Sequence, residues 1–181
     1  RIDGKPVAPN LARVAAQGGA LAPAYSHVGF TTASLKSLFA GSLVVPPGSP
    51  SLFRELDASG YEIGVFSGQP EDFGGISAAV GMREVADRFV DAEVLKDQRA
   101  FSFAAQGSLL VDENIVLDRF DAALGDAAAW ETPQFVYLNF QTPHFPYHHD
   151  AVPHRFANPP LERGQITEDN REALERTYWN A

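Results

Sequence analysis

Residues 134–140 (QFVYLNF) form a nearly continuous apolar run, which is followed by the polar, proline-rich stretch 141–160. A strand that is buried on both faces has this pattern, and such strands lie inside parallel sheets. Residues 61–66 form a second, shorter apolar run, which follows a helical pattern and a glycine. Repeated helix–glycine–strand order is typical of parallel βα units. We therefore expect an α/β fold, a three-layer α/β/α sandwich with a mainly parallel sheet in which 134–140 is an interior strand.

Other patterns complete this outline. Residues 20–26 are expected to be extended, and residues 88–90 are expected to form a short strand. Ser51 has the position of a helix cap, whose side-chain oxygen accepts from a first-turn N–H group. Helical periodicity and punctuation predict helices that begin at Pro9, near Ala33, after Ser51, at Asp112 and at Thr167.

Composition excludes several classes of function. The chain has 181 residues, of which 45% are hydrophobic and 20% charged, which suits one domain or a large piece of one. The net charge is −9 with the acids spread along the chain, so no broad basic surface is available for nucleic acid. The absence of cysteine excludes disulfides, thiolate metal sites and a cysteine nucleophile. No apolar run approaches the ~20 residues needed to span a bilayer, and both ends of the chain look cut.

Two threonines, Thr31 and Thr32, stand where an extended segment meets a short apolar helix. The first turn of a helix carries unpaired N–H groups at the positive end of the helix dipole. Such a place can hold a phosphate or sulfate and can help an alkoxide to form. It is also the ordinary place of a capping hydroxyl. Local sequence therefore leaves two interpretations of Thr31, a nucleophile or a helix cap.

Four of the five histidines fall within eleven residues just after the apolar run 134–140. In an open parallel sheet, ligands bind at the carboxyl ends of the strands, so this loop is a candidate site. His144 stands in a proline-rich segment that restricts its backbone, and a fixed imidazole suits proton transfer or phosphate contact. The spacing of the other three matches no standard zinc pattern. We expect exposed loop histidines, or metal ligands with Asp150 as an added oxygen donor, at His148, His149 and His154.

Four segments in the same order carry a resemblance to a known family. These are 7–18 (VAPNLARVAAQG), 31–41 (TTASLKSLFAG), 56–66 (LDASGYEIGVF) and 135–147 (FVYLNFQTPHFPY). They resemble the Pro-Asn helix, the nucleophile segment, the Gly-Tyr helix–strand unit and the Pro-His strand end of the sulfatase branch of the alkaline phosphatase superfamily. The resemblance implies an alkaline phosphatase-like fold that is incomplete at both ends. It implies that residues 1–181 are a single partial sulfatase-like catalytic domain.

The resemblance places Thr31 at the family's nucleophile position. Sulfatases have a cysteine or serine there that is converted to formylglycine, and threonine cannot undergo that conversion. The chain is closest in nucleophile type to the lipoteichoic acid synthase-like and phosphoethanolamine transferases. The resemblance therefore implies a metal-dependent phosphodiesterase or phosphoryl-group transferase. A divalent ion (Zn, Mn, Mg or Ca) would bind Thr31 Oγ, and His144 would contact the substrate or protonate the leaving group.

The resemblance also implies which residues bind an anionic ester, such as a phospholipid head group or a glycan. Leu35 and Gln69 stand where sulfatases often carry arginine and lysine, which weakens a sulfate-ester interpretation. The family's other metal ligands, acidic residues before the Pro-Asn helix and a later Asp-His pair, are not found in this sequence. We expect them outside this chain, and we expect the chain alone to be inactive or nearly so. The expected substrate-binding residues are Ser34, Lys36, Gln69 and His148.

Alternatives to a phosphoryl-group enzyme stay open at this point. One is a sulfuric ester hydrolase of the arylsulfatase type, and another is a noncatalytic descendant that binds an anionic glycan or lipid head group. A third is purely structural, with Thr31 as a helix cap and His144 as a turn residue. The resemblance favours a periplasmic or extracellular location, and the sequence predicts no oligomeric state.

Overall fold

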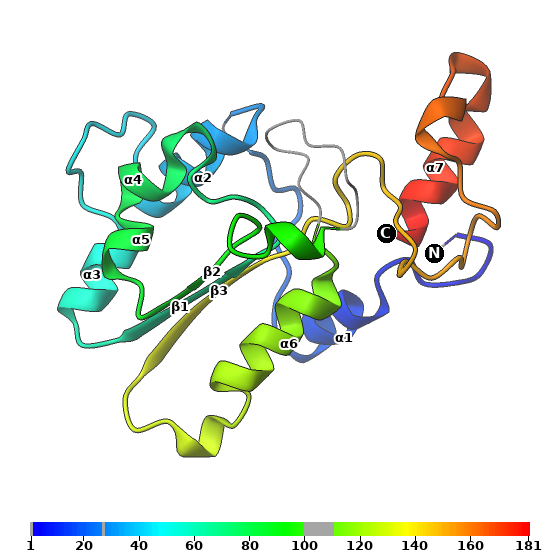
Figure 1. Cartoon of the computed structure of the whole chain (residues 1–181). Helices are drawn as coiled ribbons and strands as arrows, with labels where there is room; N and C mark the ends of the chain where they lie inside the picture. The colour runs from blue at the N-terminus through cyan, green and yellow to red at the C-terminus, as the bar shows by residue number, and fades with distance from the viewer. Residues whose placement is uncertain (1, 27, 100–110) are drawn as a thin grey trace.

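Three parallel strands form the sheet at the centre of the protein, as the computed structural model shows (Figure 1). The structure describes residues 2–26, 28–99 and 111–181. The central strand is β1 (Glu62–Ser67), which lies between β2 (Arg88–Val90) and β3 (Gln134–Asn139). Both pairings are parallel, and Val65 of β1 stands beside Phe89 of β2 and Tyr137 of β3. The carboxyl ends of all three strands therefore lie at one edge of the sheet.

Helices cover both faces of this sheet. Alternate residues of a strand point to opposite sides, so each strand contributes side chains to both faces. Ile63 and Val65 pack with residues of the helices on one face, and Phe66 packs with those of the helix on the other. This arrangement confirms the predicted three-layer α/β fold. The first face carries α2 (Thr31–Ala40), α3 (Leu52–Ala58), α4 (Ile76–Val80) and α5 (Met82–Val85), and the second carries α6 (Glu113–Leu124).

The prediction that 134–140 is an interior strand is wrong within the described sheet, where β3 lies at an edge. Its apolar run has a different cause. Phe135 and Tyr137 pack on the core beneath α2 and α3, and Val136 packs on the core beneath α6. A strand that is covered on both faces reads as continuously apolar whether or not it is paired along both edges.

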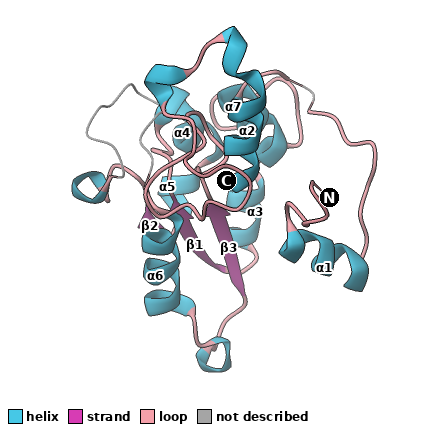
Figure 2. Ribbon diagram, turned by 90° about the vertical axis from the view of Figure 1, so that its right-hand side faces the viewer, coloured by secondary structure: helices cyan, strands magenta, loops and turns pink. Residues whose placement is uncertain are grey.

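The N-terminal turn and the last helix lie away from the sheet (Figure 1). Helix α1 (Pro9–Gln17) buries none of its residues and stands at one side of the molecule (Figure 2). The N-terminal turn is tied to helix α7 (Arg171–Asn180) by an ion pair between Asp3 and Arg176, with 2.8 Å between Oδ2 and Nη1. In the described residues no helix is both long and apolar enough to cross a membrane.

The element boundaries differ from the predictions in two places that matter. Helix α2 begins at Thr31, two residues before Ala33, because Phe30 is already extended and takes the N-cap position. Helix α7 begins at Arg171, since a separate 3₁₀ turn occupies Glu168–Asn170. The predicted cap at Ser51 is confirmed, with Oγ accepting from Arg54 N–H at 3.3 Å.

Candidate functional site

Glu71 joins the ends of all three strands. Its Oε1 accepts hydrogen bonds from Ser67 Oγ (2.5 Å) at the end of β1 and from Asn139 Nδ2 (2.8 Å) at the end of β3. Its backbone N–H donates to Oδ2 of Asp91 (3.1 Å), directly after β2. Burial raises the pKa of Glu71, although the bonds from Ser67 and Asn139 oppose the change. Glu71 therefore fixes the sheet edge at which the loops of the candidate site begin.

Thr31 lies exposed in the first turn of α2. The N-cap residue, Phe30, has no side-chain oxygen, so no side chain caps this helix. Among the described residues, no hydrogen bond engages the Thr31 hydroxyl. The first-turn N–H groups and an exposed hydroxyl thus lie at the same end of the helix, which is a suitable arrangement for an anionic oxygen. Thr31 does not have the hydrogen bond of an ordinary cap.

Two further predicted residues of α2 have polar partners. Ser34 Oγ lies 3.3 Å from Ser26 Oγ. Lys36 Nζ donates to the carbonyl of Gly74 at 2.6 Å, and Gly74 lies in the loop after β1. A Cβ at Gly74 would overlap the methyl group of Thr32, so this loop touches the first turn of α2. Lys36 therefore holds the loop against the helix that carries Thr31.

Gln69 lies in the same loop and is 5% exposed. Its Nε2 is buried without a hydrogen-bond partner among the described residues. Its backbone N–H donates to Ser67 Oγ at 3.0 Å. The side chain is thus an unpaired donor beneath the surface, at the carboxyl end of β1.

His144 lies exposed in the loop after β3, with Nδ1 3.0 Å from the Phe145 carbonyl oxygen. A neutral tautomer protonated at Nδ1 would donate there and leave Nε2 as an acceptor. Within the described part of the chain, neither a hydrogen bond nor an ion pair joins His144 to Thr31. The structure leaves both groups accessible but does not bring them into contact.

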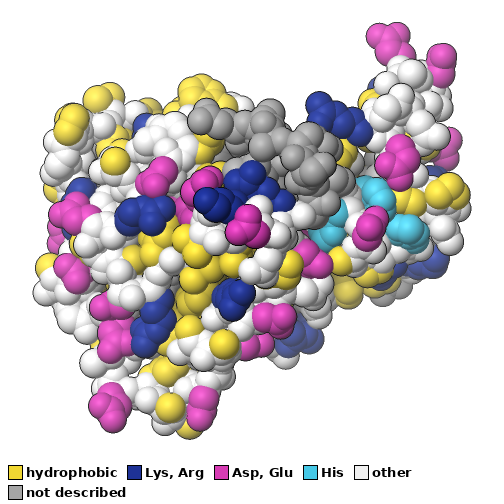
Figure 3. Space-filling view, in the orientation of Figure 1, with side chains coloured by type: hydrophobic (Ala, Val, Ile, Leu, Met, Phe, Trp, Pro, Cys, Tyr) yellow, Lys and Arg dark blue, Asp and Glu magenta, His cyan; other side chains and the backbone are white. Residues whose placement is uncertain are grey.

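The expectation of exposed loop histidines is wrong for His149, which is 5% exposed. Its Nε2 lies 3.5 Å from Oε2 of Glu113 and 3.4 Å from Oγ1 of Thr142. His148 is partly buried, and this burial lowers the pKa of its imidazole despite Glu162, whose Oε1 is 3.8 Å away. His154 is exposed and its ring centroid lies 5.4 Å from that of His148. Histidine side chains gather at one place on the surface in Figure 3.

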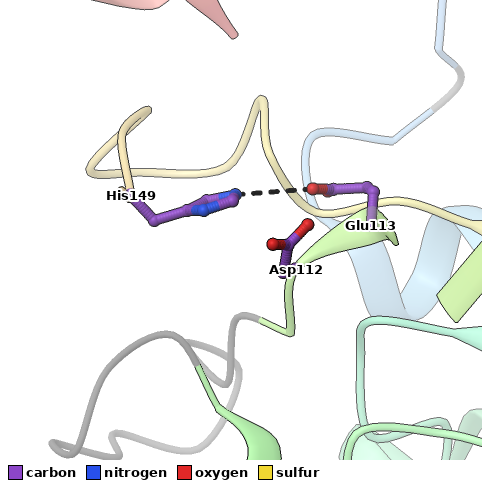
Figure 4. Close-up of side chains that lie close together, drawn as sticks. All are labelled: Asp112, Glu113 and His149. Carbon is purple, nitrogen blue, oxygen red and sulfur yellow. Dashed lines mark ion pairs between the residues drawn. The ribbon is translucent and has the colours of Figure 1, made fainter. Parts of the chain in front are cut away.

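Glu113 lies at the start of α6, where it meets the histidine loop (Figure 4). Its Oε1 accepts from the backbone N–H groups of Gln141 (2.8 Å) and Thr142, and its Oε2 accepts from the Thr142 hydroxyl. Burial acts to raise the pKa of Glu113, but the hydrogen bonds of His149 and Thr142 outweigh it, so the pKa is lowered. Glu113 stays ionised and fixes the chain just before His144.

Asp112, Glu113 and His149 are the one group of three histidine and carboxylate side chains, within the described ranges, whose ligand atoms lie close enough for one metal ion. Asp150 is not in this group. Threonine is not among the residue types that define it, and the other ligands of an ion at Thr31 are expected outside this chain. The sequence did not identify Asp112 and Glu113 as possible metal ligands. Two acidic residues at the start of a helix are ordinarily explained by an N-cap and by a favourable interaction with the helix dipole.

The model of the family described as "Sulfatase" matches residues 2–181. The chain belongs to the sulfatase family. A solved structure of a protein in the alkaline phosphatase superfamily from Vibrio parahaemolyticus is 13% identical, with a TM-score of 0.44. That match covers 72% of this sulfatase-family chain and 29% of the other chain, so this chain spans less than a third of its length. No curated protein matches the sequence.

Proposed function

We propose that this chain is part of a metal-dependent hydrolase or phosphoryl-group transferase that acts on phosphate esters, with Thr31 as the nucleophile. Residues 1–181 would form one partial catalytic domain of that enzyme. Family membership supports a sulfatase-like chemistry, in which an anionic ester is attacked at phosphorus or sulfur. The proposal of phosphate rather than sulfate as the substrate ester depends on residue 31, because a threonine cannot be converted to formylglycine.

The observation that carries the proposal is the exposed and unbonded hydroxyl of Thr31 in the uncapped first turn of α2. Free N–H groups in that turn would hold the nonbridging oxygens of the ester. Lys36, bound to the Gly74 carbonyl, adds positive charge one turn further along. These groups suit a phosphate that is held directly above Thr31 Oγ.

In the proposed reaction, the bond from Thr31 Oγ to phosphorus forms while the ester oxygen leaves. The hydroxyl proton of Thr31 passes to solvent, and the leaving oxygen takes a proton from Nε2 of His144, which would have to be in its doubly protonated form to give it. Since no contact joins these two residues, the substrate itself would lie between them. The divalent ion that the resemblance implies would activate the Thr31 oxygen when bound, with ligands from outside the described residues.

The proposal is tested with an intact protein that carries this chain. Turnover of bis(p-nitrophenyl) phosphate and of p-nitrophenyl sulfate is measured with added Mn²⁺ or Zn²⁺ for wild type and for Thr31→Val. We expect phosphodiester turnover that falls at least ~10³-fold in Thr31→Val, because loss of a covalent nucleophile costs that much or more.

Thr32→Val is the matched control, because it removes a neighbouring hydroxyl and keeps the methyl group against Gly74. We expect it to retain wild-type turnover. Undiminished turnover in Thr31→Val would exclude Thr31 as the nucleophile. Turnover of the sulfate ester alone would favour the arylsulfatase-like alternative. The description of the matching family, "Sulfatase", supports the same alternative. Binding of anionic esters without any turnover would favour the noncatalytic descendant.

A further inference from the structure

We propose that Asp112, Glu113 and His149 form a binding site for a divalent transition-metal ion of the zinc class. The site lies where α6 begins against the loop after β3. It shares no residue with the metal role proposed for Thr31, and it goes beyond the proposed function. Ions of this class prefer one or more imidazoles together with carboxylates.

The three side chains supply suitable donors with a suitable charge. One imidazole nitrogen and two carboxylate oxygens lie within 4.8 Å of one another. The two carboxylates together balance the double positive charge of the ion. His149 is buried and Glu113 is largely shielded, with 6% and 18% of their side chains exposed. A shielded carboxylate such as that of Glu113, with a second carboxylate nearby, is costly unless positive charge compensates it.

The distance between His149 and Glu113 also suits two ligands of one metal ion. His149 Nε2 is 3.5 Å from Glu113 Oε2, whereas N–H···O bonds cluster at about 2.9–3.0 Å. Two ligands that each lie about 2.1 Å from a zinc ion, at a tetrahedral angle, are about 3.4 Å apart. Thr142 Oγ1, 3.4 Å from the same nitrogen, is a hydrogen-bond partner and not one of the three ligands. The imidazole is therefore held at a ligand-to-ligand distance from the Glu113 oxygen.

Surrounding hydrogen bonds orient the carboxylates, as partners behind metal ligands do. The backbone N–H groups of Gln141 and Thr142 hold Oε1 of Glu113, which directs Oε2 toward His149. Asn114 donates to Oδ1 of Asp112 through its backbone N–H (2.9 Å) and its Nδ2 (2.8 Å). The second oxygen of Asp112 has no hydrogen bond among the described residues. Figure 4 shows His149 and Glu113 facing each other with Asp112 beside them.

A cavity beside these residues leaves room for a fourth ligand. Its volume is about 340 Å³, and its wall includes all three side chains as well as Phe140 and Val152. Three protein ligands with an open position are typical of zinc sites that bind water or a small anion. The cavity also gives the ion a path from solvent.

The test is metal binding by the protein after treatment with a chelator. Zn²⁺ binding is measured by titration calorimetry, and the visible absorption of Co²⁺ reports its coordination. The variants are Asp112→Asn and His149→Ala, with His154→Ala as the control, since His154 is exposed in the same loop. We expect wild type and the control to bind equally, and each site variant to bind at least ~10-fold more weakly.

Asp112→Asn decides the result if His149→Ala does not fold, because Asp112 is at the surface and its Oδ1 bonds survive the change. Circular dichroism of the metal-free variants shows whether each one folds. Equal Zn²⁺ affinity in Asp112→Asn and wild type would overturn the proposal, as would the absence of binding in wild type. Turnover is not a readout here, so a failure of the Thr31 proposal would leave this result unchanged.

Discussion

Glu71 lies fully buried at the point where β1 and β3 end. Its Oε1 has two donors, but its Oε2 is buried with no hydrogen-bond partner in the described residues. The carboxylates of Asp91 and Asp72 raise its pKa further, while Arg83 pairs with both of them rather than with Glu71. Ionisation of Glu71 therefore works against folding.

We predict that Glu71→Gln stabilises the protein increasingly as the pH rises. The folded-state pKa lies above the ordinary value of 4.5, so wild type loses stability as the pH rises from 4.5 through the folded pKa. The loss is at most about 1.4 kcal/mol per pH unit in that interval. Urea unfolding between pH 4 and 8 measures it. The difference between variant and wild type should grow with pH and then level off.

The matched control for this change is Asp118→Asn, on the exposed side of α6. Its carboxylate makes no hydrogen bond or ion pair in the described structure, so its removal should leave the slope of stability against pH nearly unchanged. A Glu71→Gln variant whose stability follows wild type at every pH would show that Glu71 is not the group that titrates.

At the scale of elements, capping decides where several helices begin. Ser51 caps α3 and Asp112 caps α6 through side-chain oxygens, and both residues stand out in the sequence. Helix α2 has no such cap, and it starts earlier than its sequence indicates. Helices α1, α4, α5 and α7 also begin without a side-chain cap, so the missing cap alone does not mark α2 as an anion site.

We predict that Ser51→Ala destabilises the protein by about 2–3 kcal/mol. The change removes the helix cap, worth about 1 kcal/mol, and leaves the Val80 carbonyl without the Ser51 hydroxyl that donates to it at 2.5 Å. Chemical denaturation measures the free energy of unfolding. Ser59→Ala is the control, because its hydroxyl bonds only to the exposed carbonyl of Glu55, and it should cost less than ~0.5 kcal/mol. Equal losses in the two variants would contradict the capping role.

At the scale of the whole molecule, the two faces of the sheet carry separate apolar clusters. Aromatic rings dominate the first, where Phe53 meets Phe39 edge-to-face with ring centroids 4.8 Å apart and meets Phe135 at 5.5 Å. Phe53 is completely buried and joins α2 and α3 to the edge strand β3. This cluster holds the helix of Thr31 against the sheet.

We predict that Phe53→Ala lowers the free energy of unfolding by about 3–5 kcal/mol, since it opens a cavity in a closely packed cluster. Leu52→Ala, one residue earlier and 43% exposed, should cost far less. Equilibrium denaturation in guanidinium chloride compares the two. A cost for Phe53→Ala as small as that for Leu52→Ala would mean that this face does not hold the fold together.

Much of the fold could be predicted from the sequence, because it depends on local patterns. The alternation in β1, the apolar run of β3 and the periodicity of α6 each lie within a dozen residues. The edge position of β3 could not be predicted, because an apolar run reports burial on two faces and says nothing of its neighbours. The candidate site divides in the same way. Thr31 and His144 follow from motifs, and their roles stay predictions, whereas Glu113 has no motif.

The sequence by itself determined the α/β class, the order of the strands and of the longer helices, and the motifs that match the sulfatase family, but it did not predict α4 and α5. Only the tertiary structure decided that His149 is buried against Glu113, that Lys36 bonds to the Gly74 carbonyl and that Glu71 joins three strands. Most of these contacts join residues about 30 or more positions apart. Periodicity shows which side of an element is apolar, but the packing of whole elements selects which polar groups meet at their ends.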